Sequence, residues 1–165
     1  MSGLEPRPSY AVRISRPDGR WRVELLAKHA GGVLEALEQA LGEFGEDGWP
    51  PPVVVVVDAG LFFVALRHGP GGMVRALISD ASMQEWVLVS EVLERYGIGA
   101  EKDFLYDDDE TGSPDGDLDL FADDGLPAAE LRPILTADDL WADEMVTAIA
   151  TRLGFADELA AAVTW

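Results

Sequence analysis

Apolar and polar side chains alternate at the beginning of the chain. Tyr10, Val12 and Ile14 are separated by smaller or polar residues, and a second alternating run begins at Trp21. A period of two is typical of a half-buried β-strand. The residues at 16–19 read Arg-Pro-Asp-Gly, which is a turn signal between the two runs. The pattern therefore predicts a β-hairpin over residues 10–25 with one apolar face.

Helical spacing follows, and then a wholly apolar run. Apolar residues recur at helical spacing over 33–44, with glutamates on the opposite side. Five valines occupy 53–57, and a strand without polar positions is typical of a sheet centre that is covered on both faces. Short turns then lead into apolar segments at 61–67 and 73–78. These three segments predict an antiparallel meander.

A second helix is predicted over residues 82–96. Ser82 and Glu85 have the spacing of a capping box, and Gly97 suits the helix end. The resulting order is β-β-α-β-β-β-α. We therefore predict an α+β domain over residues 9–100 with a five-stranded antiparallel sheet. The same order occurs in profilin-like and roadblock-type regulatory domains, which is an analogy of fold alone.

The composition changes sharply after residue 100. Residues 101–125 contain 11 acidic side chains and one basic side chain, together with glycine and proline. We expect this acidic connector to be partly loop. Helical spacing returns over 128–135, then in a helix that Thr136 is predicted to cap and that ends at Gly154, and again over 155–163. We therefore predict a C-terminal helical unit at 126–165, packed on the first domain because it is too small to be stable alone.

Composition excludes several classes of function. The 165 residues carry a net charge of −19, with two histidines and no cysteine. A cysteine nucleophile, a thiolate metal site and a multi-histidine metal cluster are therefore excluded. The charge opposes direct binding to nucleic acid or to anionic membranes. Because the chain shows no export signal and no transmembrane run, we expect it in the cytoplasm.

The acidic connector is the strongest candidate for a binding surface. A solvated loop is the simplest interpretation of such a segment, and a calcium site is another. An EF-hand that starts at Asp107 has Gly112 at the sixth position but Leu118 at the twelfth, where a carboxylate is required. The third interpretation is a surface for a basic partner. The residues predicted for that role are Asp107, Asp108, Asp109, Glu110, Asp115, Asp117 and Asp119.

Several segments together resemble a known family. The sequence is similar to the tRNA adenosine deaminase-associated proteins of actinobacteria over about residues 10–163. The resemblance lies in the segments LFFVALR (61–67), LISDA (77–81), DLDLFADDGLP (117–127), WADE (141–144) and IATRLGFADEL (149–159). It implies a tRNA adenosine deaminase as a partner, because the family is named for the proximity of its genes to the deaminase gene.

The chain is not itself the deaminase. Zinc deaminases require His-x-Glu and Pro-Cys-x-x-Cys, whereas this chain has no cysteine and neither His29 nor His68 precedes x-Glu. The resemblance therefore transfers no catalytic residue, and no cofactor or metal motif is present. We predict a non-catalytic accessory protein that binds a tRNA adenosine deaminase or another basic protein through its acidic segment.

Two alternatives stay open at this point. One is a homodimeric regulatory scaffold like the roadblock domains, paired through a strand edge or the helix at 81–96. The other is a small-molecule-binding domain or enzyme with a pocket between sheet and helices. Asp58 and Asp80 are its candidate site residues, because both lie at predicted strand ends, although turn formation and capping also explain them.

Overall fold

A computed structural model describes residues 9–16, 19–26, 34–42, 51–69, 71–80, 86–96, 114–137 and 139–163. These residues form a six-stranded antiparallel sheet with the order β2-β1-β3-β4-β5-β6. Its strands are β1 (Tyr10–Ser15), β2 (Arg22–Leu25), β3 (Val53–Asp58), β4 (Phe62–His68), β5 (Val74–Ile78) and β6 (Asp115–Gly116). The predicted hairpin and the predicted meander are both confirmed.

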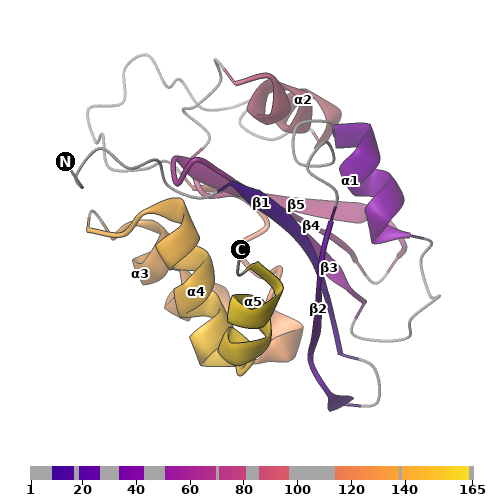
Figure 1. Ribbon diagram of the computed structural model, residues 1–165. Helices are drawn as coiled ribbons and strands as arrows, with labels where there is room; N and C mark the ends of the chain where they lie inside the picture. The colour runs from indigo at the N-terminus through magenta and orange to yellow at the C-terminus, as the bar shows by residue number, and fades with distance from the viewer. Residues whose placement is uncertain are drawn as a thin grey trace.

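Helices cover both faces of the sheet, so the molecule has three layers (Figure 1). One face carries α1 (Leu34–Leu41) and α2 (Val87–Tyr96). The other carries α3 (Ala128–Leu135), α4 (Ala142–Leu153) and α5 (Ala156–Val163). None of these helices has the length and apolar character needed to cross a bilayer.

The valine strand β3 explains this layered arrangement. Val53, Val55 and Val57 belong to the core beneath α3–α5, whereas Val54 and Val56 belong to the core beneath α1 and α2. All five are at most 3% exposed. Successive side chains of a strand point to opposite faces, so an uninterrupted apolar run requires cover on both sides. The prediction of a central, doubly covered strand is confirmed.

The predicted number of strands was too small. The sheet has a sixth strand, β6, within the connector that the sequence suggested to be partly loop. It pairs with β5 at only two positions, Leu77 with Gly116 and Ile78 with Asp115. A two-residue strand shows no alternation of polar and apolar residues, and glycine is typical of turns. For that reason the hydropathy pattern gave no sign of it.

The helices begin and end close to the predicted positions, with two qualifications. The segment that contains Ser82 and Glu85 lies outside the described residues, so the predicted capping box there stays a prediction. Helix α4 begins at Ala142 rather than directly after Thr136, because the backbone N–H of Trp141 donates to Glu144 Oε1 at 2.9 Å and caps the helix there. Thr136 instead follows the last residue of α3 as its C-cap, so the prediction that it caps α4 was wrong. The division of the chain into a sheet domain, a connector and a helical unit also stays a prediction.

Candidate functional site

The structure describes three of the seven acidic residues predicted to bind a partner. Asp107, Asp108, Asp109 and Glu110 lie outside the described residues. Asp115 begins β6, and Asp117 and Asp119 follow it in the turn toward α3. The structure therefore places these three aspartates beside the edge of the sheet.

Each of these aspartates accepts a backbone hydrogen bond within the chain. Asp115 Oδ1 accepts from the N–H of Gly116 at 2.8 Å, and Asp117 Oδ1 accepts from the N–H of Asp119 at 2.9 Å. Asp119 Oδ1 accepts from the N–H of Ala128 at 3.2 Å, at the first residue of α3. Asp117 also forms an ion pair with Arg75 at 3.2 Å. The three residues thus shape a turn, and their role in partner binding stays a prediction.

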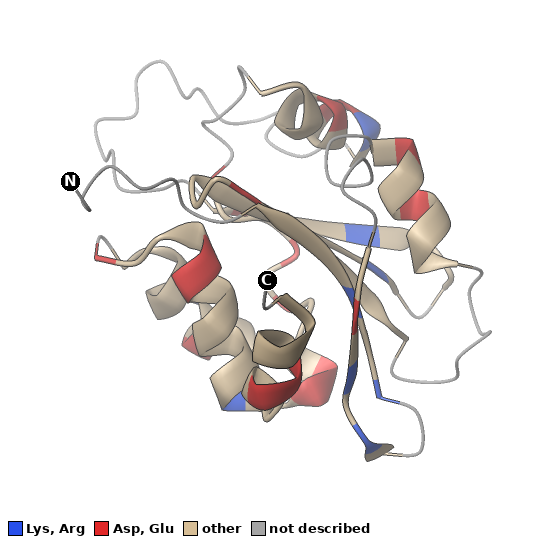
Figure 2. Cartoon of the chain, in the orientation of Figure 1, with Lys and Arg blue, Asp and Glu red and all other residues tan. Residues whose placement is uncertain are grey.

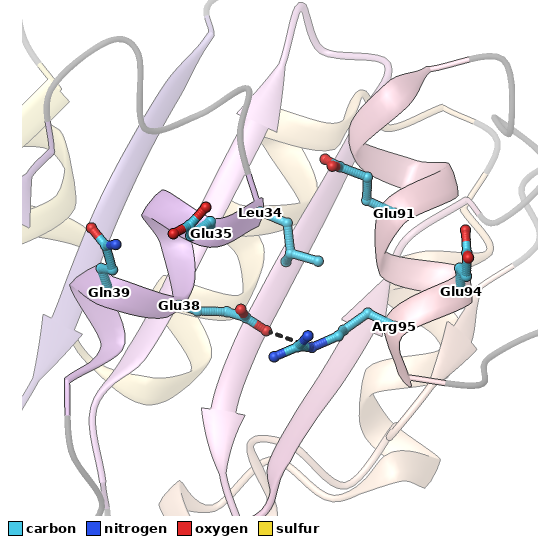
Figure 3. Close-up of a pocket in the computed structure, with 7 residues that line it drawn as sticks. All are labelled: Leu34, Glu35, Glu38, Gln39, Glu91, Glu94 and Arg95. Carbon is cyan, nitrogen blue, oxygen red and sulfur yellow. Dashed lines mark ion pairs between the residues drawn. The ribbon is translucent and has the colours of Figure 1, made fainter.

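A different acidic surface lies in the groove between α1 and α2 (Figure 3). It has a volume of about 720 Å³ and contains four glutamates and one arginine among its lining residues. The lining residues are Leu34, Glu35, Glu38, Gln39, Glu91, Glu94 and Arg95. Figure 2 shows acidic positions on both helices along this side of the molecule. We call these residues the α1–α2 groove.

The glutamates of the α1–α2 groove differ in their surroundings. Glu38 forms an ion pair with Arg95 across the groove at 3.3 Å and accepts a hydrogen bond from the Tyr96 hydroxyl. Burial, together with this hydrogen bond and the charge of Glu38, raises the pKa of Tyr96, so its hydroxyl stays a donor at neutral pH. Glu35, Glu91 and Glu94 are exposed and form no ion pair with another described residue. A basic group of a partner can approach these three directly.

Sequence reasoning missed the α1–α2 groove, although a signal was present. Glu35 and Glu38 are three residues apart, as are Glu91 and Glu94, so each pair lies on one side of its helix. The apolar stripes of both helices pack on the same sheet face, because their core residues share one cluster. What the pattern does not contain is that the two helices lie side by side, with Glu38 and Arg95 pointing toward each other between them (Figure 3).

Asp58 and Asp80, the two candidates for a small-molecule site, follow different strands at the same end of the sheet. Asp58 ends β3 opposite Phe62, which begins β4, whereas His68 ends β4. Burial raises the pKa of Asp58 and lowers the pKa of His68. The Ser9 hydroxyl bonds to Asp58 and opposes the shift there. Asp80 follows β5 at the same end of the sheet as Asp58. His68 thus lies at the opposite end of the sheet from both carboxylates.

Comparison with known proteins gives two matches. A sequence profile of the Rv3753c-like tRNA adenosine deaminase-associated proteins matches residues 9–156. Protein Rv3753c of Mycobacterium tuberculosis is 37% identical over 155 residues, which cover 93% of this chain and 87% of that protein. The chain belongs to the Rv3753c-like family. The family resemblance predicted from five sequence segments is confirmed.

Membership in the Rv3753c-like family covers nearly all of the described fold. The matched region includes β1–β6 and α1–α4, and with them the α1–α2 groove and the turn of Asp115, Asp117 and Asp119. The family description names an associated protein rather than the deaminase itself. No solved structure matches the chain. The analogy with profilin-like and roadblock-type domains is therefore not confirmed.

The carboxylates of this Rv3753c-like protein do not gather into a described metal site. Within the described ranges, no group of three or more Asp, Glu or His side chains is placed so that it could hold a metal ion. Asp117 and Asp119 are joined through a backbone hydrogen bond of the turn rather than through a shared ligand. The chemistry available at these surfaces is electrostatic attraction and hydrogen bonding through carboxylate oxygens.

Proposed function

We propose that this protein is a non-catalytic accessory protein of the cytoplasm that binds a tRNA adenosine deaminase through its acidic surfaces. The observation that carries the proposal is the α1–α2 groove, in which three exposed glutamates form no ion pair with another described residue. Membership in a family described as tRNA adenosine deaminase-associated supports the choice of partner. The sequence of the acidic connector adds 11 acidic residues and one basic residue, so it has the same sign of charge.

Electrostatics makes this pairing reasonable. An enzyme that binds tRNA needs a basic surface, because most of the affinity for nucleic acid comes from contacts with phosphates. A chain with a net charge of −19 is attracted to such a surface over a distance set by salt screening. The same charge disfavours direct contact of this protein with tRNA. We therefore infer that it contacts the protein partner rather than the nucleic acid.

The α1–α2 groove is suited to accept arginine or lysine side chains. Arg95 already lies in it and bonds to Glu38 at 3.3 Å, which demonstrates that a guanidinium group fits between the two helices (Figure 3). Glu91 and Glu94 lie on α2 beside it, and Glu35 lies across the groove on α1. A partner's basic side chain would meet the carboxylates that Arg95 leaves unpaired.

The test is a binding measurement with the tRNA adenosine deaminase from the same organism. We expect the wild-type chain to bind at low salt and to lose affinity in about 0.5 M NaCl, where screening is strong. Replacement of the groove charges by Glu91→Gln/Glu94→Gln is expected to weaken binding about tenfold at low salt. Replacement in the connector by Asp107→Asn/Asp108→Asn/Asp109→Asn is expected to act in the same direction.

A control variant with the same change in net charge separates the effect of the groove glutamates from the effect of net charge. Asp157 and Glu158 are exposed on α5, on the opposite face of the sheet from the groove. Asp157→Asn/Glu158→Gln is expected to change the affinity less than twofold. Binding that responds neither to salt nor to the groove and connector variants contradicts the proposal. Recovery of the chain only as a homodimer favours the roadblock-like alternative instead.

A further inference from the structure

The outer edge of β5 is only partly covered by the sixth strand. β6 pairs with Leu77 and Ile78, and the N–H of Asp117 then donates to the carbonyl of Ala76 at 2.8 Å. The chain turns away at that point toward α3. In the part of the chain that the structure describes, no strand therefore lies beside the first half of β5, at Val74 and Arg75.

The hydrogen bonds along β5 fix which backbone groups face this open edge. The carbonyl of Met73 accepts from Gly69, and the N–H of Ser79 donates to Phe63, so both odd-numbered residues point toward β4. The carbonyl of Ala76 points outward, toward the position of β6. Backbone groups alternate between the two sides of a strand. The N–H and carbonyl of Val74 therefore point outward, where β6 no longer reaches.

A groove of about 510 Å³ runs along this edge, and basic residues outnumber acidic residues in its lining. Arg75 lies on the sheet face of α3–α5, whereas Arg95 and Tyr96 come from α2 on the other face. Asp117 pairs with Arg75, yet the Arg75 Nε atom is buried with no hydrogen-bond partner among the described residues. The groove thus has two arginines and one aspartate in a chain of net charge −19.

We propose that this edge binds an extended, acidic segment of a partner protein as an added strand. The backbone of the segment would pair with Val74, in line with β6, and its side chains would alternate between the two faces of the sheet. Carboxylates on one face would meet Arg95 and those on the other would meet Arg75. Met73, which is 78% exposed, offers an apolar contact at the end of the groove.

This inference goes beyond the proposed function. The α1–α2 groove and the connector attract a basic surface, whereas the β5 edge attracts an acidic segment. The two surfaces share only Arg95, which lines both grooves. A change at Val74 or Met73 therefore affects the β5 edge without removing a glutamate of the α1–α2 groove.

The experiment is a selection of binders from a phage-displayed library of random heptapeptides against the full chain. We expect enrichment of peptides that carry acidic residues and no central proline. Synthetic copies of the enriched peptides are then measured by fluorescence anisotropy against wild type and four variants. Val74→Pro removes the outward N–H, and Val74→Thr keeps it as the matched control. Met73→Glu and Met73→Lys change the charge beside the groove in opposite directions.

The expected results differ among the four variants. Val74→Pro weakens binding about tenfold, since it removes a backbone donor and obstructs the edge, whereas Val74→Thr changes it less than twofold. We expect the fold to tolerate the proline, because the N–H of Val74 does not bond to β4 and proline is accepted on edge strands. Met73→Glu weakens binding of the acidic peptides, and Met73→Lys preserves or strengthens it.

Three outcomes overturn the proposal. The first is that no peptide is enriched, and the second is that the enriched peptides are not acidic. The third is that affinity is indifferent to both Val74→Pro and the charge at Met73. If Val74→Pro fails to fold, the two Met73 variants test the proposal instead, because the exposed side chain of Met73 is not part of the core. Equal affinities for the Glu and Lys variants then contradict the acidic-segment proposal.

Discussion

At the scale of single residues, the buried pair Arg67–Asp124 holds the chain of the connector against the sheet. Arg67 lies on β4, and its side chain is 4% exposed while that of Asp124 is 2% exposed. Arg67 Nη1 donates to Asp124 Oδ2 at 2.5 Å and to the carbonyl of Leu120 at 2.9 Å, and Nε donates to the carbonyl of Pro51 at 2.8 Å. One guanidinium group thereby joins three segments of the chain.

Removing one partner of this pair is expected to cost more stability than removing both. Arg67→Met leaves the Asp124 carboxylate buried without its counter-ion, and we expect the free energy of unfolding to fall by about 3–5 kcal/mol. Arg67→Met/Asp124→Leu removes both charges and is expected to recover part of that loss. Urea unfolding measures the difference. Arg132→Met on the exposed face of α3 is the control, with an expected change within about 0.5 kcal/mol.

Two results would contradict this account of the pair. One is a loss of less than about 1 kcal/mol for Arg67→Met, which would mean that water or a neighbouring group compensates the carboxylate. The other is a double variant that is no more stable than the single variant. In that case the hydrogen bonds of Arg67 to the carbonyls of Pro51 and Leu120, rather than the ion pair, would dominate its contribution.

At the scale of elements, periodicity predicted those parts of the fold that bury a regular face. The five valines of β3 and the apolar stripes of α1 and α4 each repeat over several turns or strand positions. Burial of such a face is the main favourable term in folding. It therefore leaves a pattern that can be interpreted without a structure. Which helices lie side by side is decided by packing, and so the α1–α2 groove was not predicted.

Periodicity could not predict the sixth strand, β6, because the pairing of this strand with β5 depends on a single glycine. Gly116 has a φ of +101°, and a Cβ added there would lie 2.2 Å from the carbonyl oxygen of Ala76. The position thus combines a backbone conformation that favours glycine with a close approach of two strands. In the sequence this glycine resembles those of ordinary turns, and its reason for being there lies in a residue 40 positions away.

Gly116→Ala is expected to detach β6 from β5. We expect the free energy of unfolding to fall by about 2–3 kcal/mol, because both the conformational strain and the steric clash must be relieved. Gly71→Ala is the matched control. Nothing lies within 4 Å of an added Cβ there, so this variant should be neutral or slightly stabilising. Urea unfolding gives both values, and faster hydrogen exchange at the Asp117 amide identifies the detached strand. Equal stabilities of the two variants would contradict this assignment.

At the scale of the whole molecule, we expect the positions of the charges to affect stability and binding more than the net charge does. Acidic residues lie on helices of both outer layers, whereas arginines lie along the sheet and its hairpin and also on α2, α3 and α4 (Figure 2). Glu91 and Glu94 are neighbours on α2, and Glu94 lies in the last turn of that helix, where a negative charge is unfavourable. Asp157 and Glu158 lie in the first turn of α5, where a negative charge is favourable.

The two charge variants that remove these pairs should therefore change stability in opposite directions. Glu91→Gln/Glu94→Gln is expected to raise the melting temperature by about 1–3 °C at low salt, because it removes a like-charge pair near a helix C-terminus. Asp157→Asn/Glu158→Gln is expected to lower it by a similar amount. Both shifts should shrink in about 0.5 M NaCl, since exposed charges are screened. Differential scanning calorimetry at the two salt concentrations measures them.

This contrast also tests whether the groove glutamates serve binding rather than folding. Each variant removes two negative charges, so net charge cannot explain a difference of sign between them. A groove variant that is more stable and yet binds the deaminase more weakly means that the chain keeps Glu91 and Glu94 at a cost to its own stability, as binding surfaces often do. A groove variant that loses stability together with binding would instead make these glutamates part of the packing between α1 and α2, and the loss of binding would follow from a disturbed fold.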